Sequence, residues 1–402
     1  MNILFVAPYA PGHVRVRSFH LLRHLRRRGH EVTLLSLAWP GDGQSRVAEL
    51  EAEGVRAVSA PIGRVRSWTN CLIALLRGQP MQARHSWSPA LARRLREEIA
   101  RSHPDVLHIE HLRGACYALD LDGVAPAGSA LRVWDSVDCI SALLAQTVHN
   151  SHSGLWRLAA RLELAATRRY EARVARTFDR VLLASDHDVR ALSDTVATTR
   201  FAVLPNGVDL DAFPYHDPGD RGAEVVFSGA MSYHANTATA LHLVDTILPR
   251  VWAERPDARL TIVGSSPPRT LLRHAGRAAE RLRITGWVPS VQPYLAAAAV
   301  AAMPMRYGAG TQIKVLEAMA SGTPVVTDPR TAGAIGAAPG RELLVARTDE
   351  EFAAAILGLL GDPARRRSLA EAGRRRVESE LSWERAAETL EHHYRDALAA
   401  RP

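Results

Sequence analysis

The sequence has few cysteines and no long hydrophobic run. Cys71, Cys116 and Cys139 are far apart and fit neither a disulfide framework nor a metal-ligand spacing, so we expect a reducing compartment and no bound metal. The N-terminus reads as a first strand, because no basic segment precedes a long apolar stretch there. Nothing approaches the roughly 18 uncharged apolar residues of a membrane span. These absences predict a cytoplasmic protein without a signal peptide or a membrane span.

Acidic residues are outnumbered in this chain. The 42 Asp and Glu residues stand against 50 Lys and Arg residues, which leaves a net charge of +8. Such a surplus is typical of a protein with an anionic partner, although a basic solvated surface explains it equally well. No zinc-finger, RNA-binding or homeodomain pattern accompanies the charge, so we expect no nucleic acid. Basic residues at 24–28, with Trp68 and Trp87, would suit peripheral contact with the inner membrane face, but a solvated helix end is the plainer interpretation.

Short apolar runs alternate with helical patterns in both halves of the chain. This alternation predicts an α/β protein with two Rossmann-like, doubly wound parallel sheets covered by helices. Several runs of the second half end in Gly or Pro, and ligands bind at those ends in open α/β sheets. The expected strands are 3–7, 31–37, 106–109, 131–134, 181–184, 224–228, 260–263, 283–285, 300–303, 325–327 and 343–346, and the clearest helices are 15–28, 154–177 and 382–399.

A turn-rich segment separates the two halves. Residues 204–209 read Leu-Pro-Asn-Gly-Val-Asp, and Pro with Asn-Gly marks a turn that leaves no room for a helix or strand. We therefore expect an N-terminal domain at 1–205, a C-terminal domain at 206–380, and a helix at 381–402 that crosses back to the N-terminal domain. Two such halves imply a cleft between them, which is a common ligand site.

One stretch of the second half runs from a strand through glycines into a helix. Gly308 and Gly310 let the backbone approach a ligand, and Thr311 is expected to cap the helix and leave its first amides available for an anion. Lys314 and Glu317 share one face of that helix, about 5.4 Å apart along its axis. We therefore expect the amides and Lys314 to hold a nucleotide diphosphate and Glu317 to hold the ribose. The alternative is a glycine turn beside an ordinary surface Lys–Glu pair.

Taken together, the motifs resemble the GT-B glycosyltransferases of family 4, the retaining group 1 enzymes, over nearly the whole chain. The resemblance rests on residues 8–12, 104–108, 204–209, 286–288 and 316–326. It implies an acceptor site on the N-terminal domain and a nucleotide-sugar donor site on the C-terminal domain. It also implies transfer to a hydroxyl with retention at the anomeric carbon, without a metal or another cofactor.

Two departures from the family pattern point to a glycine-rich subgroup. The family commonly carries two glutamates separated by seven residues, but the position that precedes Glu317 in this way is Ala309. The family also commonly carries Arg and Lys after the first strand of its second domain, where residues 228–236 contain neither. The residues expected to compensate the diphosphate charge instead are Lys314, Arg306, Arg15 and Arg17.

The resemblance also implies roles for single residues. His111, or else His108, would touch the donor sugar, although a lone histidine is as often structural. The predicted catalytic residues are His111, Lys314, Gly310 and Thr311. Those predicted to bind the donor are Gly12, Arg15, Gly229, Gly286, Trp287, Val288, Arg306, Gly308, Gln312 and Glu317. Those predicted to contact the acceptor are Asp135, Asp138 and Arg17, with helix capping as the alternative for the two aspartates.

The predicted activity is transfer from a nucleotide diphosphate sugar, a UDP-sugar by family frequency, to a hydroxyl acceptor. The acceptor is a glycan, a lipid-linked glycan or a small metabolite, and the sequence does not choose among them. Two alternatives stay open. A nucleotide-sugar 2-epimerase of the same fold would convert the donor without an acceptor, and a non-catalytic binding protein would fit the missing glutamate at Ala309.

Overall fold

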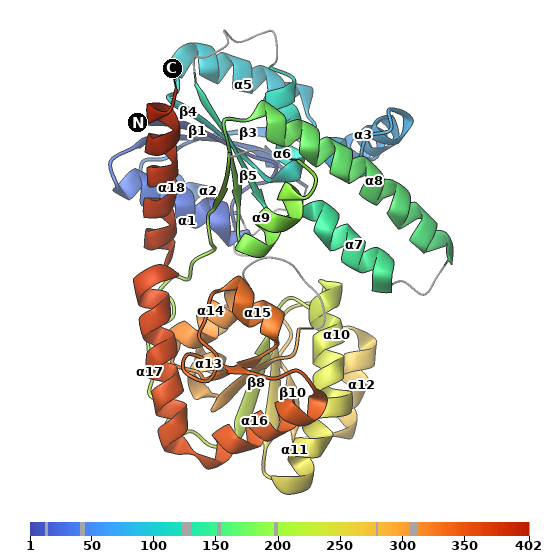
Figure 1. The fold of residues 1–402 in the computed structure, drawn as a ribbon, viewed down its shortest axis with the longest axis vertical. Coiled ribbons are helices and arrows are strands. Elements are labelled where there is room, and N and C mark those ends of the chain that lie inside the picture. Colours follow the sequence, from blue (N-terminus) through green and yellow to red (C-terminus); the bar gives the residue numbers. More distant parts are fainter. Residues whose placement is uncertain are drawn as a thin grey trace. The chain divides into compact units, whose positions relative to one another are not determined.

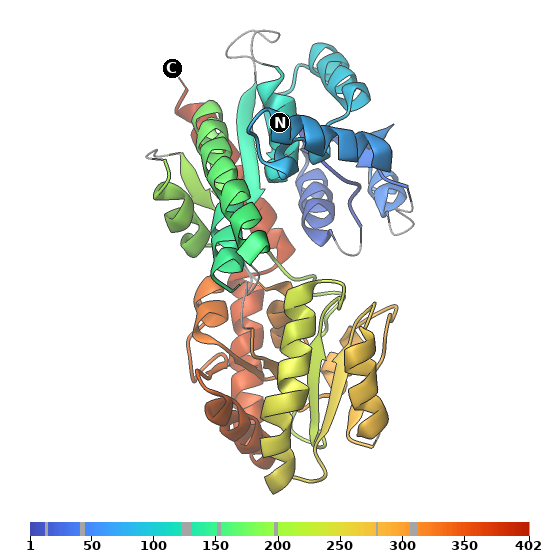
Figure 2. The same ribbon diagram turned by 90° about the vertical axis from the view of Figure 1, so that its right-hand side faces the viewer.

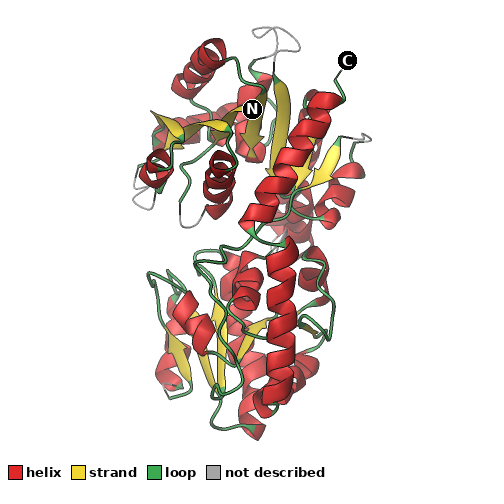
Figure 3. Ribbon diagram, turned by 90° about the vertical axis from the view of Figure 1, so that its left-hand side faces the viewer, coloured by secondary structure: helices red, strands yellow, loops and turns green. Residues whose placement is uncertain are grey.

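The structure is a computed structural model of the chain, and it describes residues 1–402 except 13–14, 41–44, 122–129, 151–153, 197–199, 279, 306–311 and 402. The described chain forms two compact units. The first contains residues 1–205 and 386–402, and the second contains residues 206–385. Each unit is built on one parallel β-sheet with helices packed against it, so the predicted α/β class is confirmed (Figure 1, Figure 3).

The sheet of the first unit has the strand order β3-β2-β1-β4-β5-β6-β7, and every neighbouring pair is parallel. The order reverses between β1 and β4, and folds of this type bind ligands beyond the carboxyl ends of such strands. The strands are β1 (Asn2–Ala7), β2 (Glu31–Ala38), β3 (Arg56–Pro61), β4 (Val106–Glu110), β5 (Leu131–Val137), β6 (Arg180–Leu183) and β7 (Phe201–Val203). The helices are α1 (Val16–Arg27), α2 (Val47–Ala52), α3 (Arg64–Leu76), α4 (Met81–His85), α5 (Pro89–Ser102), α6 (His111–Leu119), α7 (Ile140–Asn150), α8 (Gly154–Thr177) and α9 (Asp186–Ser193).

The sheet of the second unit has the order β10-β9-β8-β11-β12-β13 and is also parallel, with its reversal between β8 and β11. The strands are β8 (Glu224–Ser228), β9 (Arg259–Val263), β10 (Leu282–Ile284), β11 (Val300–Met303), β12 (Val325–Thr327) and β13 (Leu344–Val345). The helices are α10 (His234–His242), the π-helical η1 (Leu243–Ile247), α11 (Leu248–Glu254), α12 (Arg269–Arg277), α13 (Gln292–Ala297), α14 (Ile313–Ala320), α15 (Pro329–Ala334), α16 (Asp349–Gly361), α17 (Pro363–Glu380) and α18 (Trp383–Ala399).

Central strands are buried on both faces, which explains their unbroken apolar runs. Residues 3–7 of β1 and 300–303 of β11 have no exposed surface. Two strands of the first unit were missed by the sequence analysis. Strand β3 reads Arg-Ala-Val-Ser-Ala-Pro and β7 has only three residues. Both lie at the edges of the sheet, where less burial demands fewer apolar residues.

From residue 386 onward, helix α18 belongs to the first unit. Its Leu390 and Tyr394 side chains are fully buried. The hydroxyl of Tyr394 hydrogen-bonds Nδ1 of His108 in β4 at 2.8 Å, and Nε of Arg28, just after α1, donates to Glu391 at 2.5 Å. These contacts attach the end of the chain to the sheet of its first unit.

Candidate functional site

In the second unit, the predicted donor segment lies at the point where the strand order reverses. Strand β8 ends at Ser228 and is followed by Gly229, while the chain after β11 leads into helix α14. The reversal between β8 and β11 therefore brings the Gly229 loop and the start of α14 to the same edge of the sheet. This is the position at which open α/β sheets accept a ligand.

Lys314, in the first turn of α14, reaches the loop after β8. Its Nζ donates to Oδ1 of Asn236, and it lies 5.1 Å from the centre of the Phe227 ring. The Asn236 amide is itself held, because its Nδ2 donates to the carbonyl of Ala230 at 2.8 Å. A β-carbon at Gly229 would lie 2.7 Å from Nδ2 of Asn236 and 3.1 Å from Nζ of Lys314. Only glycine therefore fits between the strand and the lysine.

Burial shifts the pKa values of Lys314 and Glu317. Burial lowers the pKa of Lys314 to about 8, against the attraction of Glu317. Burial likewise raises the pKa of Glu317 to about 7, against the attraction of Lys314. Each side chain is half-buried on one face of α14. A bound diphosphate would stabilise the charged form of Lys314.

Lys314 is also the only lysine among the 402 residues. Every other basic side chain apart from the histidines is an arginine. A lysine ammonium is a compact point charge with three donors, whereas a guanidinium is a planar fork. That the chain has a lysine at this position alone supports a specific role for Lys314.

Helix α14 begins at Ile313, with Gln312 at the N-cap position and no side-chain hydrogen bond there. The predicted cap, Thr311, lies outside the described residues, as do the other glycine-loop predictions Arg306, Gly308 and Gly310, together with Ala309.

The loop after β10 carries the residues predicted to hold the base. Gly286 has a φ of +69°, in the region that favours glycine. Trp287 is 67% exposed, which excludes the alternative that it is a core residue. Val288 packs against the core of the second unit and fixes the loop.

In the first unit, the predicted glycine and arginine follow β1 at the reversal point of that sheet. Gly12 forms an isolated bridge with Ser45. The guanidinium of Arg15 lies over the ring of Tyr9, 4.0 Å from its centre. The ring of Tyr9 lies 6.2 Å from that of His111. The ends of β1 and β4 thus bring Arg15, Tyr9 and His111 together.

His111 is held in an unusual conformation. It begins α6 with a φ of +64°, which is uncommon for a residue other than glycine. Burial, with Arg113 and Arg15 nearby, lowers its pKa to about 3, so the ring is neutral. Its Nδ1 accepts from the backbone N–H of Arg113 at 3.2 Å, which assigns the ring proton to Nε2. His111 can therefore present an uncharged donor at the end of β4.

Arg17 and Asp135, predicted to contact the acceptor, form a buried ion pair instead. Nε and Nη2 of Arg17 donate to the Asp135 carboxylate at 2.8 and 3.1 Å, and Nη2 also donates to the carbonyl of Leu204 at 2.9 Å. Burial opposes the charge of Asp135, but Arg17 and His108 outweigh it and lower its pKa to about 2. With Asp135 fully buried, this pair joins helix α1 to strand β5 and to the chain after β7.

Asp138 and Glu171 lie at the start of α7. Burial and Asp188 raise the pKa of Asp138 to about 7. Capping of α7, considered for Asp138 from the sequence, is carried out by Glu171 and Asp188. Glu171 of α8 accepts from the backbone N–H groups of Ile140 and Ser141 at 2.8 and 3.3 Å, and Asp188 accepts from that of Cys139 at 3.2 Å.

Sequence reasoning missed three residues of these clusters. Asn236 was within the segment noted for lacking cations, but only the fold shows its bond to Lys314. Glu110, next to His111, is buried, and burial with Asp135 raises its pKa to about 8. Arg113 lies near Tyr9 and Arg15, and burial lowers its pKa. A polar residue directly at a strand end, as in Glu110, is the available sequence signal.

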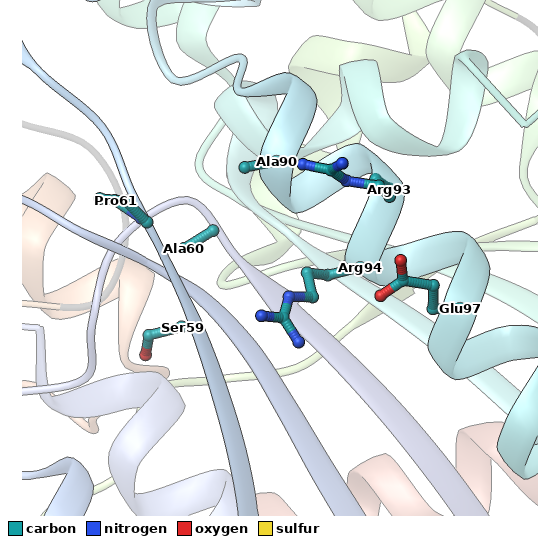
Figure 4. Close-up of a pocket in the computed structure, with 7 residues that line it drawn as sticks. All are labelled: Ser59, Ala60, Pro61, Ala90, Arg93, Arg94 and Glu97. Carbon is teal, nitrogen blue, oxygen red and sulfur yellow. The ribbon is translucent and has the colours of Figure 1, made fainter.

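A separate pocket of the first unit lies between the edge strand β3 and helix α5 (Figure 4). It includes none of the predicted site residues. It is lined by Ser59, Ala60, Pro61, Ala90, Arg93, Arg94 and Glu97. Within the described residues, no group of His, Cys, Asp or Glu side chains is arranged to hold a metal ion. None of the described helices combines the length and apolar character that a membrane span requires.

Comparisons with known proteins agree with this geometry. Residues 222–362 match the family model "Glycosyl transferases group 1", and residues 12–207 match the "Glycosyl transferase 4-like domain". The phosphatidyl-myo-inositol mannosyltransferase of Mycolicibacterium smegmatis is 28% identical over 90% of this chain and 85% of its own length. The GDP-mannose-dependent monoacylated alpha-(1-6)-phosphatidylinositol monomannoside mannosyltransferase of Corynebacterium glutamicum is 34% identical, over 47% of this chain and 55% of its own length.

A solved structure extends the likeness to the whole fold. The sucrose-phosphate synthase of Thermosynechococcus elongatus superposes with a TM-score of 0.74 over 100% of both chains, at 19% identity. The two family models together span both units. The chain is therefore an enzyme of the group 1 glycosyltransferases, with the GT-B fold, as the resemblance in its sequence indicated.

Proposed function

We propose that this enzyme transfers a sugar from a nucleotide diphosphate sugar to a hydroxyl of a lipid-linked acceptor, with retention at the anomeric carbon. The observation that carries the proposal is the half-buried Lys314 at the start of α14, bonded to Asn236 where the strand order reverses. The amides of a helix start and a nearby ammonium suit a diphosphate.

The difficult step is departure of the nucleoside diphosphate. Negative charge develops on the phosphate oxygens as the glycosidic bond breaks, and Lys314 with the first amides of α14 stabilises it. Glu317, one turn further along, holds the ribose hydroxyls. In the first unit, the neutral His111 donates from Nε2 to the sugar, and Gly12 and Arg15 flank the reacting groups.

The donor we favour carries mannose on GDP. The Corynebacterium relative is named as GDP-mannose-dependent, and both reported sequence relatives are named as mannosyltransferases. Family frequency alone favoured a UDP-sugar, and the named relatives weigh more because they match this chain itself. The relatives' names also support an acceptor with a lipid-linked inositol. Arg15 and Arg113, near Tyr9, suit an acceptor that carries an anionic group.

The test uses the single lysine of the chain. Lys314→Ala should lower turnover with GDP-mannose at least tenfold, about 1.4 kcal/mol of barrier. Lys314→Arg serves as the charge-conserving comparison, and it should recover only part of the rate because its geometry differs. In the wild type, bound donor should protect Lys314 from an amine-reactive reagent, as read by mass spectrometry; the N-terminal amine in the same sample is the control.

Three outcomes separate the candidates. Donor protection with transfer to a phosphatidylinositol acceptor supports the proposal. Protection without transfer or conversion of the donor identifies the non-catalytic binding protein that the absent glutamate at Ala309 keeps open. Conversion of the donor in the absence of any acceptor identifies the epimerase. Unchanged turnover in Lys314→Ala removes this residue from the mechanism.

A further inference from the structure

The apolar face of α3 points away from the core of the first unit. A surface helix normally turns its apolar stripe inward, yet the buried residues of α3 are Ser67, Asn70 and Ala74. Its exposed side chains are Val65 (78%), Trp68 (77%), Leu72 (57%), Ile73 (40%), Leu75 (62%) and Leu76 (79%). The helix therefore presents an apolar face to solvent along its whole length.

Polar contacts hold α3 in this orientation. Oγ of Ser67 donates to the carbonyl of His85 at 3.0 Å, and Nδ2 of Asn70 donates to the carbonyl of Trp87 at 2.7 Å. Turning the apolar stripe inward would break both hydrogen bonds and leave buried polar groups unpaired. The exposed stripe is thus built into the packing of the first unit.

Neighbouring residues of α8 extend the apolar face. Glu163 of α8 accepts from the backbone N–H of Met81 at 2.9 Å, which ties this helix to the chain just after α3 (Figure 1, Figure 2). Met81 is 44% exposed, and Leu158 and Leu162 of α8 are 57% and 66% exposed. Exposed apolar side chains gathered on neighbouring helices mark an interaction site rather than ordinary surface.

The chain around α3 is strongly basic. Between Glu53 and Glu97 the sequence contains eight arginines and no Asp or Glu. Arg64, Arg66 and Arg77 are exposed beside the apolar side chains. An apolar face bordered by cations, with a tryptophan among the apolar residues, is the composition that binds the interface of an anionic bilayer.

We propose that the exposed face of α3, extended by Leu158 and Leu162, is a docking surface for an anionic phospholipid bilayer. Trp68, Leu72 and Leu76 enter the interface, and Arg64 and Arg77 contact lipid phosphates. This surface replaces the basic face at 24–28 considered from the sequence, because Arg27 and Arg28 are paired with Glu53 and Glu391. Docking does not depend on which sugar the enzyme transfers. The proposal rests on the proposed function in one respect only, namely that docking gives access to a lipid-linked acceptor.

The experiment measures flotation of the full chain with vesicles, without donor or acceptor. The wild type should float with vesicles of phosphatidylcholine mixed with phosphatidylglycerol, and only weakly with phosphatidylcholine alone. A Trp68→Ser, Leu72→Ser and Leu76→Ser variant should lose at least tenfold in vesicle affinity. Arg64→Gln with Arg77→Gln should lose affinity roughly tenfold for the anionic vesicles only, and salt should weaken binding of the wild type.

Leu272→Ser in α12 of the second unit is the matched control, because Leu272 is also an exposed leucine (46%). It should float like the wild type. Nucleotide protection of Lys314 should be unchanged in the triple serine variant, which shows that the variant is folded and separates this proposal from the function of the donor site. Equal flotation of wild type and triple variant would overturn the proposal. A wild-type dimer that the triple variant converts to monomer, without vesicle binding, would assign the face to a second copy instead.

Discussion

At the scale of single residues, this enzyme places ionisable groups where burial changes their charge. Burial lowers the pKa of Lys314 to about 8 and raises that of Glu317 to about 7, so the proposed donor site holds two groups that titrate near neutral pH. Glu110 lies at the corresponding strand end of the first unit, and its Oε2 is buried without a hydrogen-bond partner among the described residues. Glu110 ends β4, whereas Lys314 and Glu317 lie in the helix that follows β11, and both strands adjoin the point where the order of their sheet reverses.

Glu110 gives a prediction on pH and stability. Its pKa is about 8 in the folded chain and near its ordinary value of 4.5 when unfolded. A carboxyl whose folded pKa is raised favours the folded state fully below pH 4.5, and that contribution is lost as the pH rises towards 8. Glutamine has no proton to lose in this pH range, so Glu110→Gln should not lose stability in this way as the pH rises. At pH 8 the variant should therefore be more stable than the wild type, by on the order of 4 kcal/mol.

Denaturant unfolding across the pH range measures the effect. The two chains should have similar stability near pH 4.5 and diverge above it. Glu97→Gln, at an exposed position in α5, is the control and should follow the wild type. Parallel stability curves for Glu110→Gln and wild type would show that Glu110 is not buried in its neutral form.

Residue positions were predictable from the sequence only where a motif fixed them. The sequence placed Lys314 and Glu317 in a helix start, and both lie in α14, while their roles stay predictions. The ion pair of Arg17 with Asp135 joins residues 118 positions apart, and the bond from Lys314 to Asn236 spans 78. Spacing along the chain carries no information on such contacts, because only the order of strands in the sheet brings them together.

At the scale of elements, helix α7 depends on a side chain from another helix. Glu171 of α8 accepts from the first backbone N–H groups of α7, at Ile140 and Ser141. Glu171→Ala should therefore destabilise the first unit by about 1–2 kcal/mol. Glu171→Gln should lose less, since its amide oxygen still accepts. Thermal unfolding measures both variants, and an alanine variant as stable as the glutamine variant would contradict the capping role.

Elements themselves were largely predictable because central strands of parallel sheets need apolar residues on both faces. Helix α8 matches its predicted bounds of 154 and 177. The edge strands β3 and β7 were not predicted, because partly buried strands need fewer apolar residues and so give a weaker pattern in the sequence. The apolar face of α3 also reads like a core helix in the sequence, and only the packing of Ser67 and Asn70 reveals that it faces outward.

At the scale of the whole molecule, the last helix stabilises the first unit. The hydroxyl of Tyr394 is bonded to Nδ1 of His108, and both side chains are buried. Tyr394→Phe leaves that nitrogen unpaired, which should cost about 1–3 kcal/mol in the first unit. Added nucleotide shows which thermal unfolding transition belongs to which unit, because it should stabilise the second unit and raise the midpoint of that transition only. The variant should lower the midpoint of the other transition, which belongs to the first unit.

Tyr294→Phe in α13 makes the same chemical change in the second unit and is the control. It should leave the transition of the first unit where it is in the wild type. If Tyr394→Phe lowered the nucleotide-sensitive transition instead, α18 would belong energetically to the second unit.

The division of the chain has a consequence for its synthesis. Residues 206–385 are continuous, so all of the second unit emerges from the ribosome before residues 386–402. The first unit, although most of it is translated earlier, lacks Leu390 and Tyr394 until those residues are made, and the apolar surface that they cover stays accessible to chaperones during that interval. The second unit, although its synthesis begins later, can thus complete its fold before the first unit does.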